Sequence, residues 1–191
     1  MPRADRIEYE NAYYHVMNRG RGRRDIFHGK PYYEAFLACL MEAHTQFGLE
    51  IHAYCLMGNH YHLLVKTPLG NISRCMRHIN GVYTQRFNRL KKTDGPLFRG
   101  RFKAILIERD AYLATLTRYI HRNPIETRKP IVDKLASYLW SSYPAYINQK
   151  EAPDWLFREE TYELLGYHRR YVDYKSFAEL GVDDEVEVFT Q

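Results

Sequence analysis

A chain of 191 residues with 45% hydrophobic and 15% aromatic side chains can bury one substantial core, so we expect a single main domain. No stretch approaches the roughly 20 apolar residues of a membrane span, and the first residues lack the apolar segment of a secretory signal, so we expect a cytoplasmic protein without membrane contact. Cys39, Cys55 and Cys75 are widely spaced and form no CxxC pair, which argues against a disulfide framework and a thiolate zinc site.

The net charge of +5 is unevenly distributed. Residues 1–149 carry 23 Lys+Arg and 12 Asp+Glu, whereas residues 150–191 carry 5 and 11. A basic body with an acidic tail indicates a polyanionic partner such as nucleic acid for the body. The alternative is that these charged side chains only solvate the protein surface and bind no partner.

The first half of the chain predicts a strand, a loop, a helix and a hairpin. A weakly alternating strand at 12–18 leads into the basic, glycine-containing loop "RGRGRRD" at 19–25. Pro31 opens a helix that Gly48 ends. Two strands, 49–57 and 60–67, are joined by a tight turn at Gly58 and Asn59.

The second half predicts two more helices and one more strand. An apolar stripe runs along a helix at 71–90, a strand follows at 100–108, and a helix at 111–122 is capped by Asp110 and ended by Pro124. The order βαββαβ predicts an α+β, ferredoxin-like antiparallel sheet with helices on one face, plus an extra helix. We place the domain at 1–146 and an acidic C-terminal extension at 147–191.

Two histidines in "GNHYHLLV" suggest a metal site. His60 and His62 are one residue apart on a predicted strand, so both side chains emerge on the same face and can share one metal ion. The alternative is a pair of histidines on a half-exposed sheet face.

The spacing of polar residues indicates which tyrosine could act as a nucleophile beside this metal site. A nucleophile and a polar ligand on one helix should lie four residues apart. Among 17 tyrosines, only Tyr14 with Asn18 and Tyr119 with Asn123 have Asn, Gln, Asp, Glu or His at that spacing. Tyr14 lies in a predicted strand, where four residues span about 13 Å. Tyr119 remains, although it could simply border an apolar helix stripe, and Asn123 could simply end the helix.

Four motifs in order resemble a known family. "GNHYHLLV", "LFRGRFKAILIERDAYL", "RYIHRNP" and "LWSSY" are similar to the REP-associated tyrosine transposases, which are HUH enzymes related to the single-tyrosine transposases of IS200-like elements. The resemblance covers residues 10–146. Residue 58 is glycine where the family often has proline, and "PIETR" replaces a small and basic run after Asn123.

The resemblance implies a role for each matched position. His60, His62 and Asn123 would hold Mg²⁺ or Mn²⁺, and Tyr119 would cleave single-stranded DNA through a 5′-phosphotyrosine link that a 3′-hydroxyl can reverse. The family acts on hairpins from repetitive extragenic palindromes, so we expect hairpin-forming single-stranded DNA as partner and a monomer or homodimer.

Basic residues in three segments could bind phosphates. Phe98 or Phe102 could stack bases. The predicted DNA-binding residues are Arg19, Arg21, Arg23, Arg24, Arg74, Arg77, Arg86, Arg99, Arg101 and Lys103. Two alternatives stay open: a non-catalytic single-stranded nucleic-acid-binding protein, since RNA-binding modules share this element order, and another HUH nickase such as a replication initiator or relaxase.

Overall fold

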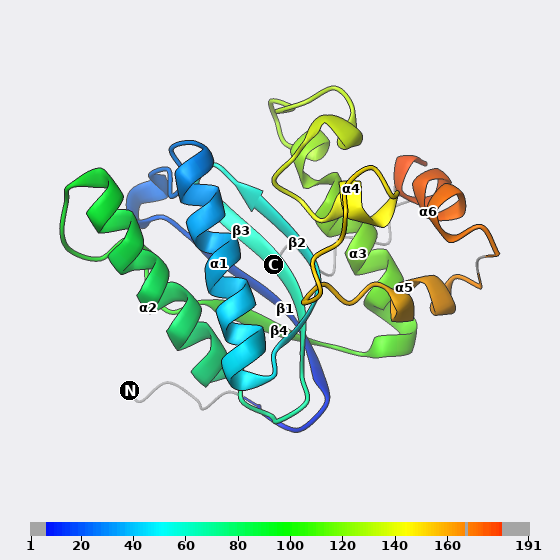
Figure 1. The fold of residues 1–191 in the computed structure, drawn as a ribbon, viewed down its shortest axis with the longest axis horizontal. Coiled ribbons are helices and arrows are strands. Elements are labelled where there is room, and N and C mark those ends of the chain that lie inside the picture. The colour runs from blue at the N-terminus through cyan, green and yellow to red at the C-terminus, as the bar shows by residue number, and fades with distance from the viewer. Residues whose placement is uncertain (1–6, 167, 181–191) are drawn as a thin grey trace.

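A four-stranded antiparallel sheet forms the centre of the computed structural model, which describes residues 7–166 and 168–180 (Figure 1). The strand order is β2-β3-β1-β4. The strands are β1 (Ala12–Arg19), β2 (Glu50–Met57), β3 (His60–Thr67) and β4 (Lys103–Ile107). Nearly every residue of β1, β2 and β3 is buried, because helices cover both faces of the sheet, and this explains why their alternation is weak in the sequence.

One face of the sheet is covered by α1 (Lys30–Phe47) and α2 (Ile72–Lys91), which pack against each other (Figure 1). Pro31 occupies the first turn of α1, where its missing N–H costs nothing. Gly48 ends α1 with a left-handed backbone, φ 67°. The apolar stripe of α2 joins the larger core through Ile72, Cys75, Met76, Ile79, Tyr83 and Phe87.

The opposite face is covered by α3 (Arg109–Glu126), whose Leu113, Leu116 and Ile120 pack against Ala53 and Leu64 of the sheet. This is the extra helix expected from the sequence. The predicted α+β, ferredoxin-like βαββαβ arrangement is therefore confirmed, with α1 and α2 on one face and the tyrosine-bearing helix on the other.

Helix α3 continues past Pro124, so the expectation that this proline ends the helix was wrong. A proline at position 124 cannot donate to the carbonyl of Ile120. The side-chain Nδ2 of Asn123 points back instead, 2.9 Å from the carbonyl of Tyr119 and 3.5 Å from that of Ile120. The longer of these contacts supplies a weak donor to the Ile120 carbonyl, which Pro124 leaves without its helical N–H partner.

The chain after α3 packs onto this helix. It contains the short helices α4 (Tyr143–Tyr146) and α5 (Glu159–Leu164), the helix α6 (Arg170–Glu179) and a 3₁₀ turn, η2 (Leu135–Ser137). The rings of Tyr143, Tyr146 and Tyr174 form the centre of a third core cluster. The domain boundary at residue 146 stays a prediction, and the acidic end at 182–191 lies outside the described residues.

Within the described part of the chain, no helix is both long and apolar enough to cross a membrane.

Candidate active site

His60 and His62 lie at the beginning of β3, directly after the Gly58–Asn59 turn, as the sequence predicts. Their ring centroids are 5.2 Å apart, and the rings are nearly perpendicular. The side chain of His62 is buried, whereas His60 is partly exposed. Both side chains emerge on the face of the sheet that α3 covers, because strand residues two apart share a face.

Asn59 sets the orientation of the His60 ring. The Oδ1 atom of Asn59 is 2.6 Å from His60 Nδ1, and its Nδ2 atom donates to the carbonyl of Arg23 at 3.2 Å. An amide oxygen can only accept, so Nδ1 of His60 carries the proton. The Nε2 atom then keeps its lone pair, which is the form of imidazole that binds a metal.

His62 has a comparable neighbour in His15, a residue that no local sequence motif indicates. Nε2 of His15 lies 2.9 Å from Nδ1 of His62, and the two buried rings stack with centroids 5.1 Å apart. His15 pairs with Leu64, and Met17 pairs with His62, so His15 is a diagonal neighbour of His62 on the same face. The β1–β3 pairing was the signal that could have revealed it.

The three imidazoles are neutral at neutral pH. Burial, helped by the charge of Lys103, lowers the pKa of His15 to about 4. Burial also lowers the pKa of His60. For His62, burial lowers the pKa well below its usual value, and the repulsion that His15 and His60 would exert if they were protonated adds to this effect. Neutral rings are what a metal site requires.

Tyr119 on α3 faces this histidine group. Its ring is in edge contact with the rings of both His15 and His62, with centroid separations of 5.9 Å in each case. Burial raises the pKa of the Tyr119 hydroxyl, the carboxylate of Glu126 adds to the rise, and the Asn123 side chain opposes it. Tyr119 and Asn123 therefore interact through their side chains, as the four-residue spacing predicts.

A cavity of about 760 Å³ lies beside the two histidines. His60 and His62 both line it, and so do five of the ten predicted DNA-binding residues, namely Arg19, Arg23, Arg99, Arg101 and Lys103. The last three are exposed. The cavity is thus strongly cationic and open to an anionic ligand.

Backbone contacts bring these basic segments together. The amide of Gly20 donates to the carbonyl of Asn59, and the amide of Arg99 donates to the carbonyl of Arg19, at 2.9 and 3.0 Å. At Gly20 a Cβ atom would lie 2.0 Å from the carbonyl oxygen of Arg24, so this close approach requires glycine. The basic loop therefore folds tightly against the turn that precedes His60.

The other five predicted DNA-binding residues lie outside this cavity. Arg21 and Arg24 are exposed on or beside the 3₁₀ turn η1 (Arg21–Arg23). Arg74 and Arg77 are exposed on α2, where the Arg74 guanidinium stacks 4.9 Å over the ring of Phe47. Arg86 pairs with Glu42 of α1 and also contacts the carbonyl of Ala35, so its charge is compensated within the fold.

Phe98 and Phe102 do not present their rings for base stacking, contrary to the expectation from the sequence. Both are at most 9% exposed and belong to the core beneath α1 and α2. They alternate with Arg99, Arg101 and Lys103, so burial of the two rings directs the neighbouring cations outward. Their role is to hold the basic segment in place.

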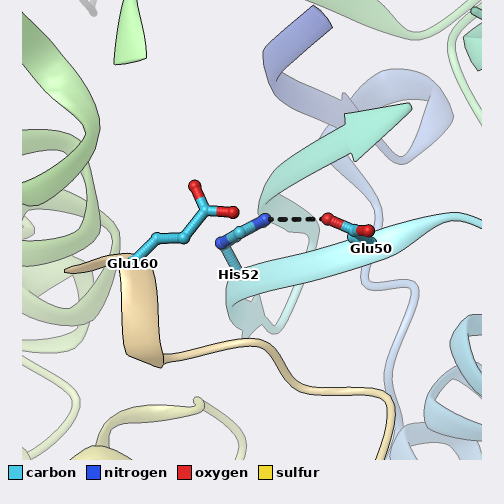
Figure 2. Close-up of side chains that lie close together, drawn as sticks. All are labelled: Glu50, His52 and Glu160. Carbon is cyan, nitrogen blue, oxygen red and sulfur yellow. Dashed lines mark ion pairs between the residues drawn. The ribbon is translucent and has the colours of Figure 1, made fainter. Parts of the chain in front are cut away.

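A second group of potential metal ligands lies near the other end of β2 and β3. Donor atoms of Glu50, His52 and Glu160 lie within 4.8 Å of one another (Figure 2). His52 is the extra residue of a β-bulge, between Ile51 and Ala53, and its Nε2 is 3.8 Å from Glu50 Oε2. The bulge places a buried imidazole between the two carboxylates.

Lysine and arginine already compensate these carboxylates. Lys66 Nζ lies 3.5 Å from Glu50 Oε2 and 3.4 Å from Glu160 Oε1, and Arg109 Nε donates to Glu160 Oε2 at 3.0 Å. A divalent ion would have to displace the Lys66 ammonium group. We therefore interpret the cluster as an ion-pair network that joins α5 and the first turn of α3 to the sheet.

Comparisons with known proteins agree with the motifs and the fold. The family model described as "Transposase IS200 like" matches residues 8–123. No curated protein gives a significant sequence match. A solved structure, "Structure of the REP associates tyrosine transposase bound to a REP hairpin", is 18% identical with a TM-score of 0.65, covering 82% of this chain and 92% of that one.

A putative transposase from Deinococcus radiodurans R1 is also similar, at 20% identity and a TM-score of 0.44, over 64% of this chain and 97% of that one. The match at 18% identity shows a shared fold. The family model spans more than half of the chain and includes His60, His62, Tyr119 and Asn123. The chain therefore belongs to the IS200-like transposase family.

Proposed function

We propose that this protein is a metal-dependent endonuclease and strand transferase that acts on hairpin-forming single-stranded DNA through a 5′-phosphotyrosine intermediate on Tyr119. The observation that carries the proposal is the edge contact between Tyr119 and His62, a residue that lines the cationic cavity. A nucleophile, two imidazoles and a phosphate-binding surface are thereby gathered at one place.

His60, His62 and Asn123 are the residues that would hold the metal. The hydrogen bond to Asn59 leaves a lone pair on Nε2 of His60, and Nδ2 of Asn123 is directed to backbone carbonyls, which leaves its Oδ1 as the ligand atom. Two nitrogens and one amide oxygen suit Mn²⁺ or Mg²⁺ with open positions. A bound divalent ion would polarise the scissile phosphate and stabilise the negative charge that develops on the leaving 3′ oxygen.

Tyr119 would supply the nucleophile. Its Oη forms a bond to the phosphorus while the bond from phosphorus to the 3′ oxygen breaks, the phenolic proton is lost, and the 3′ oxygen takes up a proton to become a hydroxyl. Because burial raises the pKa of Tyr119, the phenol is protonated at neutral pH and needs help to react. The tyrosyl phosphodiester keeps the bond energy, so a 3′-hydroxyl can reverse the step and rejoin strands.

The DNA would lie along the cavity. Arg19, Arg23, Arg99, Arg101 and Lys103 line it and can contact consecutive phosphates of an unpaired strand. The fold shared with a REP-associated transposase bound to a REP hairpin supports a hairpin with an adjoining single strand as the substrate. Such a substrate is consistent with a monomer or a homodimer.

The test is covalent adduct formation. Purified protein is incubated with labelled hairpin-forming single-stranded DNA, in Mn²⁺ or in EDTA, and resolved on a denaturing gel. We expect a DNA–protein adduct in Mn²⁺ and none in EDTA. An adduct of equal yield in EDTA would refute metal dependence. Tight binding of many hairpins with no adduct would favour a non-catalytic binding protein.

A further inference from the structure

The hydrogen bond between His15 and His62 points to a role for a residue outside the His60–His62 motif. We propose that His15 is a positioning residue, which accepts a hydrogen bond from Nδ1 of His62 and so keeps the Nε2 lone pair of His62 available to a metal. The hydrogen bond itself is a property of the metal-free protein. Its functional meaning rests on the proposed function.

The 2.9 Å contact joins two neutral rings, so one nitrogen donates and the other accepts. Two arrangements are possible. If His15 donates from Nε2, the proton of His62 must be on its own Nε2, and that atom cannot bind a metal. If His62 donates from Nδ1, its Nε2 is free of a proton, and His15 carries its proton on Nδ1. Only the second arrangement is compatible with a metal at His62.

His60 offers an internal precedent for this assignment. Its Nδ1 lies 2.6 Å from Asn59 Oδ1, an atom that cannot donate, so His60 has its proton on Nδ1. His62 uses the same ring atom, Nδ1, for its contact with His15. Both imidazoles, His60 and His62, are therefore held through Nδ1, and both would present Nε2 to the metal. Partners of this kind fix the tautomer and the ring orientation of metal-binding histidines.

Because of its location, His15 can orient His62 but cannot contact a ligand in the cavity. His15 is fully buried, and it is absent from the residues that line the cationic cavity. Its ring also stacks on His62 and touches the edge of Tyr119, so a small replacement would disturb the packing of both. His15→Phe keeps an aromatic ring but removes the acceptor, which makes it the informative variant.

The first measurement is the tautomer of His62 in metal-free protein, read from long-range ¹⁵N–¹H correlations of labelled histidine at neutral pH. We expect His62 and His15 in the Nδ1–H form in the wild type. In His15→Phe we expect His62 to change to the Nε2–H form. Since the wild-type spectrum alone tests the hydrogen-bond direction, the inference stays falsifiable even if the variant fails to fold.

The second measurement is Mn²⁺ affinity, followed by the electron paramagnetic resonance of free Mn²⁺. His15→Phe should bind Mn²⁺ about 10- to 100-fold more weakly, which is the usual effect of removing such a partner. His15→Gln places an amide oxygen near the position of Nε2 and should recover most of the affinity. His78→Phe, on α2 at the other face of the sheet, is the matched control and should bind as the wild type does.

The outcomes separate the inference from the proposed function. A wild-type His62 in the Nε2–H form, or undiminished Mn²⁺ affinity in His15→Phe, would overturn the role of His15. The expected tautomers and Mn²⁺ affinities, combined with no adduct on any hairpin, would support the role of His15 in a metal site and refute the proposed strand transfer.

Discussion

The side-chain amide of Asn123 donates a hydrogen bond to the backbone carbonyl of Tyr119, at 2.9 Å. A longer contact, 3.5 Å from the same Nδ2 to the carbonyl of Ile120, supplies a donor to the carbonyl that Pro124, which has no N–H, cannot serve. The same contact fixes which end of the amide faces away from the helix. Asn123 thus stabilises the end of the tyrosine-bearing helix, and under the proposed function its Oδ1 would also bind the metal.

Substitutions of Asn123 should separate these two roles. Asn123→Asp keeps an oxygen ligand but loses the donor, so we expect it to retain Mn²⁺ affinity and lose about 1 kcal/mol of unfolding free energy. Asn123→Leu should lose both the Mn²⁺ affinity and this part of the unfolding free energy. Urea denaturation and Mn²⁺ titration of the two variants measure this, and a Leu variant with wild-type Mn²⁺ affinity would exclude Asn123 as a ligand.

The cationic cavity predicts a specific salt dependence of DNA binding. Arg101→Gln should weaken binding of a single strand and reduce the slope of log affinity against log salt by about 0.7, because one phosphate contact is lost. Fluorescence anisotropy at several NaCl concentrations measures the slope. Lys150→Gln, an exposed lysine outside the cavity, is the control. Equal slopes for the two variants would contradict the proposed path of the DNA.

Arg86 should behave differently from the cavity arginines. Its guanidinium pairs with Glu42 between α1 and α2, so Arg86→Gln should lower the unfolding free energy by about 1 kcal/mol without changing the salt slope. Glu42→Gln should cost a similar amount, and the double variant should cost little more than either one. A reduced salt slope with unchanged stability would show instead that Arg86 contacts DNA.

The ion-pair network around Glu160 predicts how stability depends on acid. Burial alone would raise the pKa of Glu160, but hydrogen bonds from Tyr13 and Arg109, with the charges of His52 and Lys66, outweigh it and lower the pKa to about 2. The free carboxyl has a pKa of about 4.3, so the folded protein favours the ionised form. The resulting stability is present above about pH 5 and is lost as the pH falls through about 2.

Glu160→Gln should therefore unfold more easily than the wild type at pH 7, by on the order of 1–2 kcal/mol after allowance for solvent screening. The difference should shrink as the pH approaches 2. Glu163→Gln, exposed on the same helix α5, should follow the wild-type profile. Urea unfolding between pH 7 and pH 2.5 gives the profiles, and a constant difference between Glu160→Gln and the wild type would contradict the network.

Sequence patterns predicted the parts of the site that depend on local spacing. The Gly58–Asn59 hairpin places His60 and His62 on one face, and the helical spacing of Tyr119 and Asn123 brings their side chains together. His15 was missed because its contact with His62 depends on the pairing of β1 with β3, which are far apart in the sequence. Arg86 was grouped with the DNA-binding residues because its partner Glu42 lies on another helix.

The most direct test of the proposed strand transfer is to identify the residue that carries the DNA. The covalent adduct formed in Mn²⁺ is digested with nuclease and protease, and the peptide that retains nucleotide is sequenced by mass spectrometry, beside Tyr119→Phe and the control Tyr112→Phe, an exposed tyrosine of the same helix. We predict nucleotide on Tyr119, no adduct in Tyr119→Phe, and a normal adduct in Tyr112→Phe. An adduct that persists in Tyr119→Phe would show that Tyr119 is not the nucleophile.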